Sequence, residues 1–205
     1  MSKKKPLIVF EGIEGSGKTT LINHVAKFFK EKNINFIKIR EPGGNKNSEK
    51  IRKLILNKKN KFNPYTDLFL YFAARSENIE KVILKNYKKK IILLDRFTDS
   101  TVAYQHYGMN LDKKLIERIN NILLKNIKTD LIFLNVVNMR NLTKRLKIRK
   151  IKNRYDNFKI NFYKKVQNGF KKLSKNNSNY IIINSNESLS DNKNKVLNKI
   201  IKLIS

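Results

Sequence analysis

A glycine-rich stretch near the start of the chain has the residue types and spacing of a phosphate-binding loop. Gly12-Ile13-Glu14-Gly15-Ser16-Gly17-Lys18-Thr19 fits the pattern G-x-x-x-x-G-K-[ST] at every fixed position. Glycines let such a loop wrap closely, so that backbone N–H groups and a helix N-terminus point at a polyphosphate. Lys18 would reach the outer phosphates. The Thr19 hydroxyl suits a Mg²⁺ ion better than Thr20, which lies one residue beyond the pattern.

A second group of polar residues follows the predicted strands. Asp95 ends an apolar run, and a carboxylate in that position commonly holds Mg²⁺ or its water shell. The next residue is Arg96 and not a second carboxylate that would activate water, which favours transfer to a phosphate acceptor. Arg75 lies in an apolar helical turn, where an unpaired charge is costly, so we expect it to have an anionic or polar partner.

The pattern of apolar residues predicts the elements that position these side chains. Short apolar runs predict strands, and helical spacing separates them. The predicted strands are 7–10, 35–39, 90–95, 130–136 and 180–184, and the predicted helices are 20–32, 49–56, 64–88, 111–125, 158–173 and 191–204. Alternating strands and helices imply a three-layer α/β fold with a five-stranded parallel sheet. Its ligands would bind beyond the carboxyl ends of the strands.

Two segments allow two interpretations each. The turn after Arg96, over 97–107, is rich in hydroxyl and amide groups. It can form a helix capped by Asp99 or Ser100, it can contact a polar base and sugar, and both can hold at once. Residues 140–157 are rich in arginine and lysine. They are either a solvated surface or a lid that closes over transferring phosphates. In the second case the lid spans about 143–157. No linker divides the chain, so we expect one domain, 1–205.

Composition limits the partners. The 205 residues include no cysteine and two histidines, which excludes disulfides and a histidine-rich metal site and favours a reducing compartment. No apolar stretch has the length of a signal sequence or a membrane span, so we expect a soluble cytoplasmic protein. The formal net charge is +30, but lysines are spread over nearly every helix, so we expect solvated charge that steers anions and no specific nucleic acid partner.

Several segments together resemble thymidylate kinase of the bacterial type. The matching segments are Phe10–Thr20, Arg40–Gly44, Ala73–Arg75, Asp95–Phe97 with Asp99-Ser100, and Ala103–Gln105. The resemblance implies the P-loop NTPase fold and transfer of the γ-phosphoryl of ATP to dTMP, giving dTDP and ADP. It also implies Mg²⁺ as cofactor and a homodimer.

The resemblance implies a role for each matching residue. Residues 12–19 bind ATP, and Lys18 and Arg96 are catalytic, neutralising the transferring and acceptor phosphates. The implied dTMP-binding residues are Glu14, Glu41, Arg52, Tyr71, Arg75, Arg96, Thr101, Tyr104 and Gln105. Among these, Arg52 assists at the acceptor phosphate, Tyr71 stacks on thymine, and Tyr104 disfavours a 2′-hydroxyl. Thr19 and Asp95 are the metal-binding pair.

The resemblance also implies that the lid supplies a catalytic arginine, because the loop position Gly15 offers none. Arg149 and Arg154 are the candidates, ahead of Arg145. Two rival functions stay open. One is a kinase for another nucleoside or nucleotide. The other, motivated by the +30 charge, is a P-loop nucleic-acid-binding protein or regulatory switch.

Overall fold

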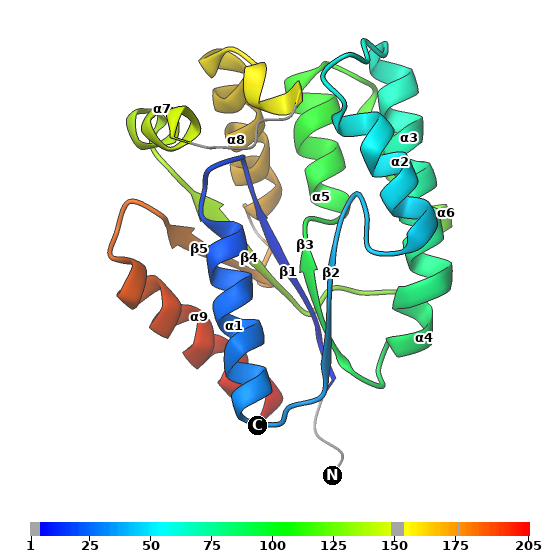
Figure 1. Ribbon diagram of the computed structural model, residues 1–205. Helices are drawn as coiled ribbons and strands as arrows, with labels where there is room; N and C mark the ends of the chain where they lie inside the picture. Colours follow the sequence, from blue (N-terminus) through cyan, green and yellow to red (C-terminus); the bar gives the residue numbers. More distant parts are fainter. Residues whose placement is uncertain (1–4, 149–153, 176) are drawn as a thin grey trace.

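A parallel β-sheet forms the centre of the molecule. The computed structural model describes residues 5–148, 154–175 and 177–205. The strands are β1 (Leu7–Gly12), β2 (Phe36–Arg40), β3 (Ile91–Asp95), β4 (Leu131–Val136) and β5 (Tyr180–Asn184). All pair in parallel, in the order β2-β3-β1-β4-β5, with β1 between β3 and β4. The predicted fold class is confirmed (Figure 1).

Helices connect the strands and cover both faces of the sheet. They are α1 (Lys18–Glu31), α2 (Lys46–Leu56), α3 (Pro64–Asn78), α4 (Leu84–Asn86), α5 (Thr98–Thr101), α6 (Lys113–Leu124), α7 (Met139–Lys147), α8 (Ile160–Ser174) and α9 (Leu189–Ile204). Shorter helical segments are η1 (Ile79–Ile83), η2 (Val102–Gly108) and η3 (Arg154–Asn157). The long helix predicted over 64–88 ends at Asn86, and a π-helical stretch, η1, interrupts it.

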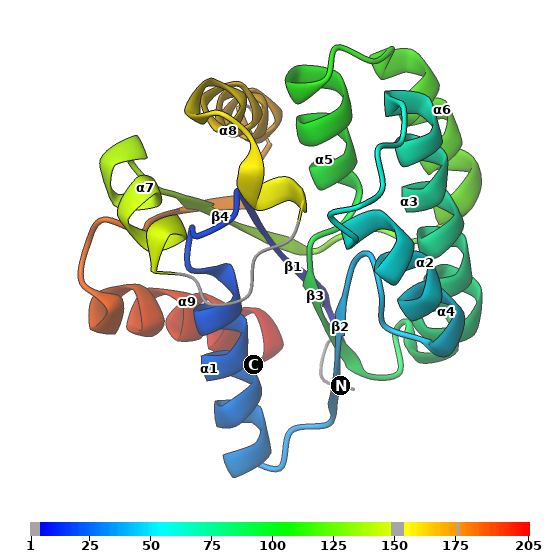
Figure 2. The ribbon, with the colours of Figure 1, turned by 45° about the horizontal axis from the view of Figure 1, so that its top comes forward.

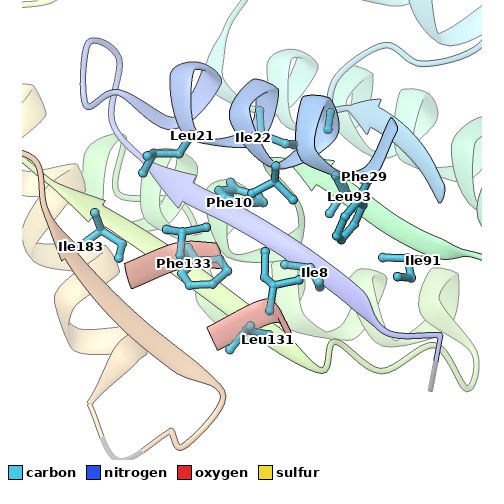
Figure 3. Close-up of a cluster of buried hydrophobic side chains, with 14 residues drawn as sticks. Ile8, Phe10, Leu21, Ile22, Phe29, Ile91, Leu93, Leu131, Phe133 and Ile183 are labelled. Atoms are coloured by element: carbon cyan, nitrogen blue, oxygen red, sulfur yellow. The ribbon is translucent and has the colours of Figure 1, made fainter. Parts of the chain in front are cut away.

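One face of the sheet packs on α1 and α9. Phe10 and Phe133 lie side by side on this face, with ring centroids 5.2 Å apart, and Phe29 of α1 packs on the same cluster (Figure 3). These three side chains are fully buried. Burial of a large apolar side chain contributes about 1.5–3 kcal/mol, so this cluster secures α1 and the loop that precedes it.

The other face of the sheet packs on the middle of the chain. Leu7, Val9 and Leu94 point to this side and join Ile79 and Ile83 of η1 in a second buried cluster. Figure 2 shows α2, α3, α4 and α6 as one group beside the β2 edge of the sheet, with α5 next to them and α8 on the far side of α5. No helix in the described part of the chain is both long and apolar enough to cross a membrane.

The strand order places the functional loops at one edge. All five strands are parallel, so their carboxyl ends lie at the same edge of the sheet. The strand order reverses at β1, because β3 and β2 lie on one side of it and β4 and β5 on the other. The loop after β1 and the segment that contains α7 and η3 lie at this edge in Figure 1. A ligand site is therefore expected beyond the end of β1.

Candidate active site

A cavity of about 630 Å³ opens at the carboxyl ends of the strands. Its walls include most residues that the sequence selected, drawn from several separate segments. Those residues are Glu14, Gly15, Ser16, Gly17, Lys18, Thr19, Glu41, Arg52, Tyr71, Arg75, Asp95, Arg96, Thr101, Tyr104 and Gln105. Gly12, Ile13 and Arg154 are not among the lining residues, and Arg149 lies outside the described residues.

The glycine-rich loop is shaped by backbone conformations that other residues rarely adopt. Gly12 has φ +135°, and a Cβ there would lie 2.4 Å from the carbonyl oxygen of Asn135 on β4. Lys18 curls back over the loop and donates from Nζ to the carbonyls of Gly12 and Ile13, at 2.8 and 2.9 Å. Burial, together with the charge of the nearby Arg96, lowers the pKa of Lys18 to about 8. A phosphate bound beside this buried ammonium would stabilise its charged form.

Thr19 and Asp95 meet at the cavity. The Thr19 hydroxyl, in the first turn of α1, donates to the Asp95 carboxylate at the end of β3, with 3.3 Å between the oxygens. One hydroxyl and one carboxylate are the donors that Mg²⁺ takes when nucleotide phosphates and water complete its shell. These two residues therefore fit the predicted metal-binding pair.

Arg96 joins the glycine-rich loop to the next wall of the cavity. Its backbone has φ +71°, in the left-handed region. Its guanidinium donates to the carbonyl of Gly12 at 2.9 Å, to the carboxylate of Glu14 at 2.8 Å and to the hydroxyl of Tyr104 at 3.2 Å. Burial opposes the charge, but Tyr104 and Glu14 outweigh it, so the pKa of Arg96 is raised and the side chain stays cationic.

Arg75 has the polar partners that the sequence led us to expect. It is 2 % exposed and donates to the carboxylate of Glu41 at 2.8 Å, the amide oxygen of Asn120 at 2.7 Å and the carbonyl of Phe97 at 2.9 Å. Burial raises the pKa of Glu41, and the ion pair with Arg75 opposes that rise. Arg75 thus fixes both Glu41 and the start of the polar turn.

The turn after Arg96 is not capped as one interpretation predicted. Helix α5 begins at Thr98, and no side chain caps it. A cap at Asp99 or Ser100 is therefore wrong, because both side chains are engaged by other parts of the chain. Asp99 accepts a hydrogen bond from the Tyr180 hydroxyl, and Ser100 donates to Glu11 at 2.6 Å.

Glu11 is a supporting residue that the sequence reasoning left without a role. This fully buried carboxylate also accepts from the backbone N–H groups of Phe97 and Ser100, at 2.8 and 3.2 Å. Burial, together with the charge of the neighbouring Asp99, raises the pKa of Glu11 to about 7. Glu11 thus holds the turn against β1. The available signal was a charged residue directly after the apolar run 7–10.

Free polar atoms lie farther along the same turn. The Thr101 hydroxyl and the Gln105 amide nitrogen are buried and have no hydrogen-bond partner among the described residues. Both residues line the cavity, as does Tyr71 on the facing helix α3. Buried polar groups without partners are rare in folded proteins, so these atoms are suited to a polar ligand.

The predicted lid approaches the cavity from two sides. Arg145, on α7, donates to the carbonyls of Gly15 and Ser185, at 3.0 and 2.7 Å, and lines the cavity. Arg154, in η3, pairs instead with the carboxylate of Asp67 on α3. The structure thus brings Arg145, the third-ranked candidate, to the phosphate loop.

The side of the cavity next to the phosphate loop contains residues that the sequence reasoning missed. Asn135 donates from its amide to Ser16 and Ser185, at 3.3 and 3.2 Å. Ser185, Glu187 and Asn192 follow the last strand and line the cavity. The rule that ligands bind beyond the carboxyl ends of strands could have selected Ser185, which directly follows β5.

The fold and this arrangement define the class of protein. A phosphate loop with its lysine and threonine, a strand-end aspartate followed by arginine, and an arginine-rich segment share one cavity at the edge of a parallel sheet. This is the arrangement of a P-loop nucleotide kinase.

Comparison with known proteins identifies the family. The family model described as thymidylate kinase matches residues 10–196. The thymidylate kinase of Mycoplasma capricolum subsp. capricolum is 38% identical over 202 residues, covering 96% of this chain and 93% of that protein. That of Sulfurihydrogenibium sp. is 37% identical, covering 86% of each. A crystal structure of thymidylate kinase from Ehrlichia chaffeensis aligns with a TM-score of 0.78 and 30% identity over 96% of this chain and 98% of that one. The chain belongs to the thymidylate kinase family.

The lowered pKa of Lys18 predicts how ATP binding depends on pH. Because the free protein loses the Lys18 proton above pH about 8, and the protonated form binds phosphate, ATP affinity falls as pH rises through that value. We expect the dissociation constant measured by calorimetry to rise about tenfold per pH unit above pH ~8. A constant that stays level from pH ~7 to ~9.5 would contradict this role, and Lys18→Arg, which keeps its charge, should remove the dependence.

Proposed function

We propose that this chain is a thymidylate kinase that transfers the γ-phosphoryl of ATP to dTMP, giving dTDP and ADP. The observation that carries this proposal is the continuity of the cavity. The phosphate loop forms one part of it, and Arg96, Tyr104 and Gln105 form another. Membership of the thymidylate kinase family supports the choice of substrates.

In the donor half, the loop over residues 12–19 holds the ATP phosphates. Backbone N–H groups, the N-terminus of α1 and the Lys18 ammonium present positive charge to them. Thr19 and Asp95 would hold Mg²⁺, which when bound would neutralise charge on the phosphate oxygens. Lys18 must leave the carbonyls of Gly12 and Ile13 to reach the γ-phosphoryl.

In the acceptor half, Arg96 binds the acceptor phosphate, and Glu14 and Tyr104 hold its guanidinium in place. Arg52 assists Arg96 in binding the acceptor phosphate. In this structure its guanidinium donates to the carbonyl of Pro42 at 2.6 Å. Tyr71 stacks on thymine. Thr101 and Gln105 offer the free polar atoms that a base needs. Arg75 acts at the base end together with Glu41.

The reaction is an in-line displacement without a covalent enzyme intermediate. The two bound nucleotides present the attacking and leaving oxygens to the same phosphoryl group. Catalysis depends on positioning and charge neutralisation by Lys18 and Arg96 and by an arginine of the lid. Tyr104, buried beside Glu14, would lie near the sugar of the acceptor, where its bulk would disfavour a 2′-hydroxyl and so favour deoxynucleotides.

We further propose that the chain is a single domain, 1–205, that forms a homodimer. Exposed apolar side chains on α3 and α6 support this: Tyr65 is 47% exposed, Phe69 52% and Ile122 66%. A second copy would cover them. Sedimentation equilibrium should give about twice 24.2 kDa. Phe69→Lys should shift the mass toward that of one chain, whereas a wild-type protein of single-chain mass at micromolar concentration would contradict the proposal.

The acceptor profile tests the proposed reaction. ADP release is measured with dTMP, dUMP, dCMP, dGMP and thymidine at equal concentrations. We expect dTMP to have the highest kcat/KM, because the base end of the cavity combines an aromatic face with the free polar atoms of Thr101 and Gln105. A higher value for another acceptor would establish the rival kinase. ATP hydrolysis that needs DNA or RNA and no nucleotide acceptor would establish the rival nucleic-acid-dependent protein.

The lid arginine is tested by single substitutions. We expect Arg149→Ala or Arg154→Ala to lower kcat by about 10²–10³-fold, because one of them neutralises the transferring phosphoryl. Arg145→Ala should act mainly on the KM for ATP, since Arg145 contacts the phosphate loop through Gly15. The hypothesis fails if Arg149→Ala and Arg154→Ala both retain wild-type kcat.

A further inference from the structure

Asp67 is a buried carboxylate that the proposed chemistry does not use. It lies in the first turn of α3 and is 3% exposed. One carboxylate oxygen pairs with the Arg154 guanidinium, and the other accepts a hydrogen bond from the Tyr155 hydroxyl at 2.6 Å. A buried carboxylate is costly unless it is paired, so these contacts hold η3 against α3.

Tyr155 forms part of the cavity wall. It is 3% exposed and lines the cavity. Its ring meets Tyr71 and Tyr104 edge to face, with centroids 6.2 and 5.9 Å apart. The rings of Tyr71 and Tyr104 hold the Tyr155 ring on two sides, and the hydrogen bond from its hydroxyl to Asp67 fixes its position. The carboxylate of Asp67 therefore determines where this part of the wall stands.

Helix α3 connects this anchor with the residues proposed for the base. Asp67, Tyr71 and Arg75 follow one another at intervals of four residues, which places them along one face of the helix. Arg154 also lies over the ring of Tyr155, 5.2 Å from its centroid. The lid thus contacts the helix face that carries the proposed thymine-stacking residue.

The two described ends of the lid have different anchors. Arg145 is bonded to Gly15 of the phosphate loop and to Ser185 after β5. Arg154 and Tyr155 are bonded to Asp67 on α3. The first anchor belongs to the donor half of the cavity and the second to the acceptor half. A substitution at Asp67 should therefore change the binding of the acceptor nucleotide.

We propose that Asp67 is a positioning residue for the acceptor: by holding Arg154 and Tyr155 against α3, it sets the wall on which the nucleoside part of the acceptor packs. This inference rests on the proposed function, in which the acceptor is dTMP. Asp67 itself does not line the cavity. Its effect on the acceptor passes through the ring of Tyr155.

The test is the kinetics of Asp67→Asn. The amide is neutral and has one acceptor oxygen, so it removes the ion pair with Arg154 and can accept only one of the two hydrogen bonds that Asp67 accepts, while the shape is kept. We expect the KM for dTMP to rise roughly tenfold, whereas kcat and the KM for ATP change by less than about twofold. Calorimetry should show thymidine binding weakened by the same factor as dTMP binding, because the wall contacts the nucleoside and not the phosphate.

Two further variants keep the test decisive. Tyr155→Phe retains the ring and loses the hydrogen bonds of its hydroxyl, to Asp67 and to Tyr71, so a smaller rise in the same KM is expected even if Asp67→Asn does not fold. Glu117→Gln removes a carboxylate from an exposed ion pair with Lys113, whose side chains are 48% and 41% exposed, and should leave every parameter unchanged. Circular dichroism reports whether each variant is folded.

Three results would overturn the inference. One is an unchanged KM for dTMP in both Asp67→Asn and Tyr155→Phe. Another is a kcat that rises without a change in KM, which would show that Asp67 restrains Arg154. The last is an equal loss for ATP and dTMP, which would show a general structural role. If wild-type protein does not phosphorylate dTMP, the proposed function fails, and the same comparison is made with the acceptor that it prefers.

Discussion

The ion pair between Arg96 and Glu14 is the interaction on which the site depends. Glu14 lies in the phosphate loop after β1, and Arg96 follows β3, so the pair joins two segments that are distant in the sequence. Both side chains are largely buried, at 17% and 12% exposed. Neither charge would be stable there without the other, because burying an unpaired ion costs roughly several kcal/mol of folding free energy. The donor and acceptor halves therefore form one cavity.

Similar pairs organise the rest of this edge of the sheet. The carboxylate of Glu11 holds the backbone of the turn after Arg96, and that of Glu41 holds Arg75 of α3. Asp67 holds the end of the lid. In each case a buried carboxylate from one element satisfies donors of another. The apolar clusters on the two faces make the sheet stable, but these polar pairs determine where the cavity walls stand.

Part of this arrangement could be predicted from the sequence. The phosphate loop and the Asp95-Arg96 pair are local patterns, and the five strands follow from short apolar runs, so the predicted class of fold was confirmed. The expected cap at Asp99 or Ser100 was wrong, because long-range partners, Tyr180 and Glu11, take both side chains. Propensity at a helix start is a weak preference that tertiary contacts override.

The sequence by itself determined the strand–loop–helix unit that carries the phosphate-loop pattern, since spacing along the chain imposes that geometry. It also indicated that Arg75 needs a partner. Only the tertiary structure decided which partner that is, and which lid arginine lies against the phosphate loop. Glu41 and Arg75 are 34 residues apart, and Asp67 and Tyr155 are 88 apart. No local pattern encodes such pairs, because they form only when the packed sheet and helices bring those charges out of water together.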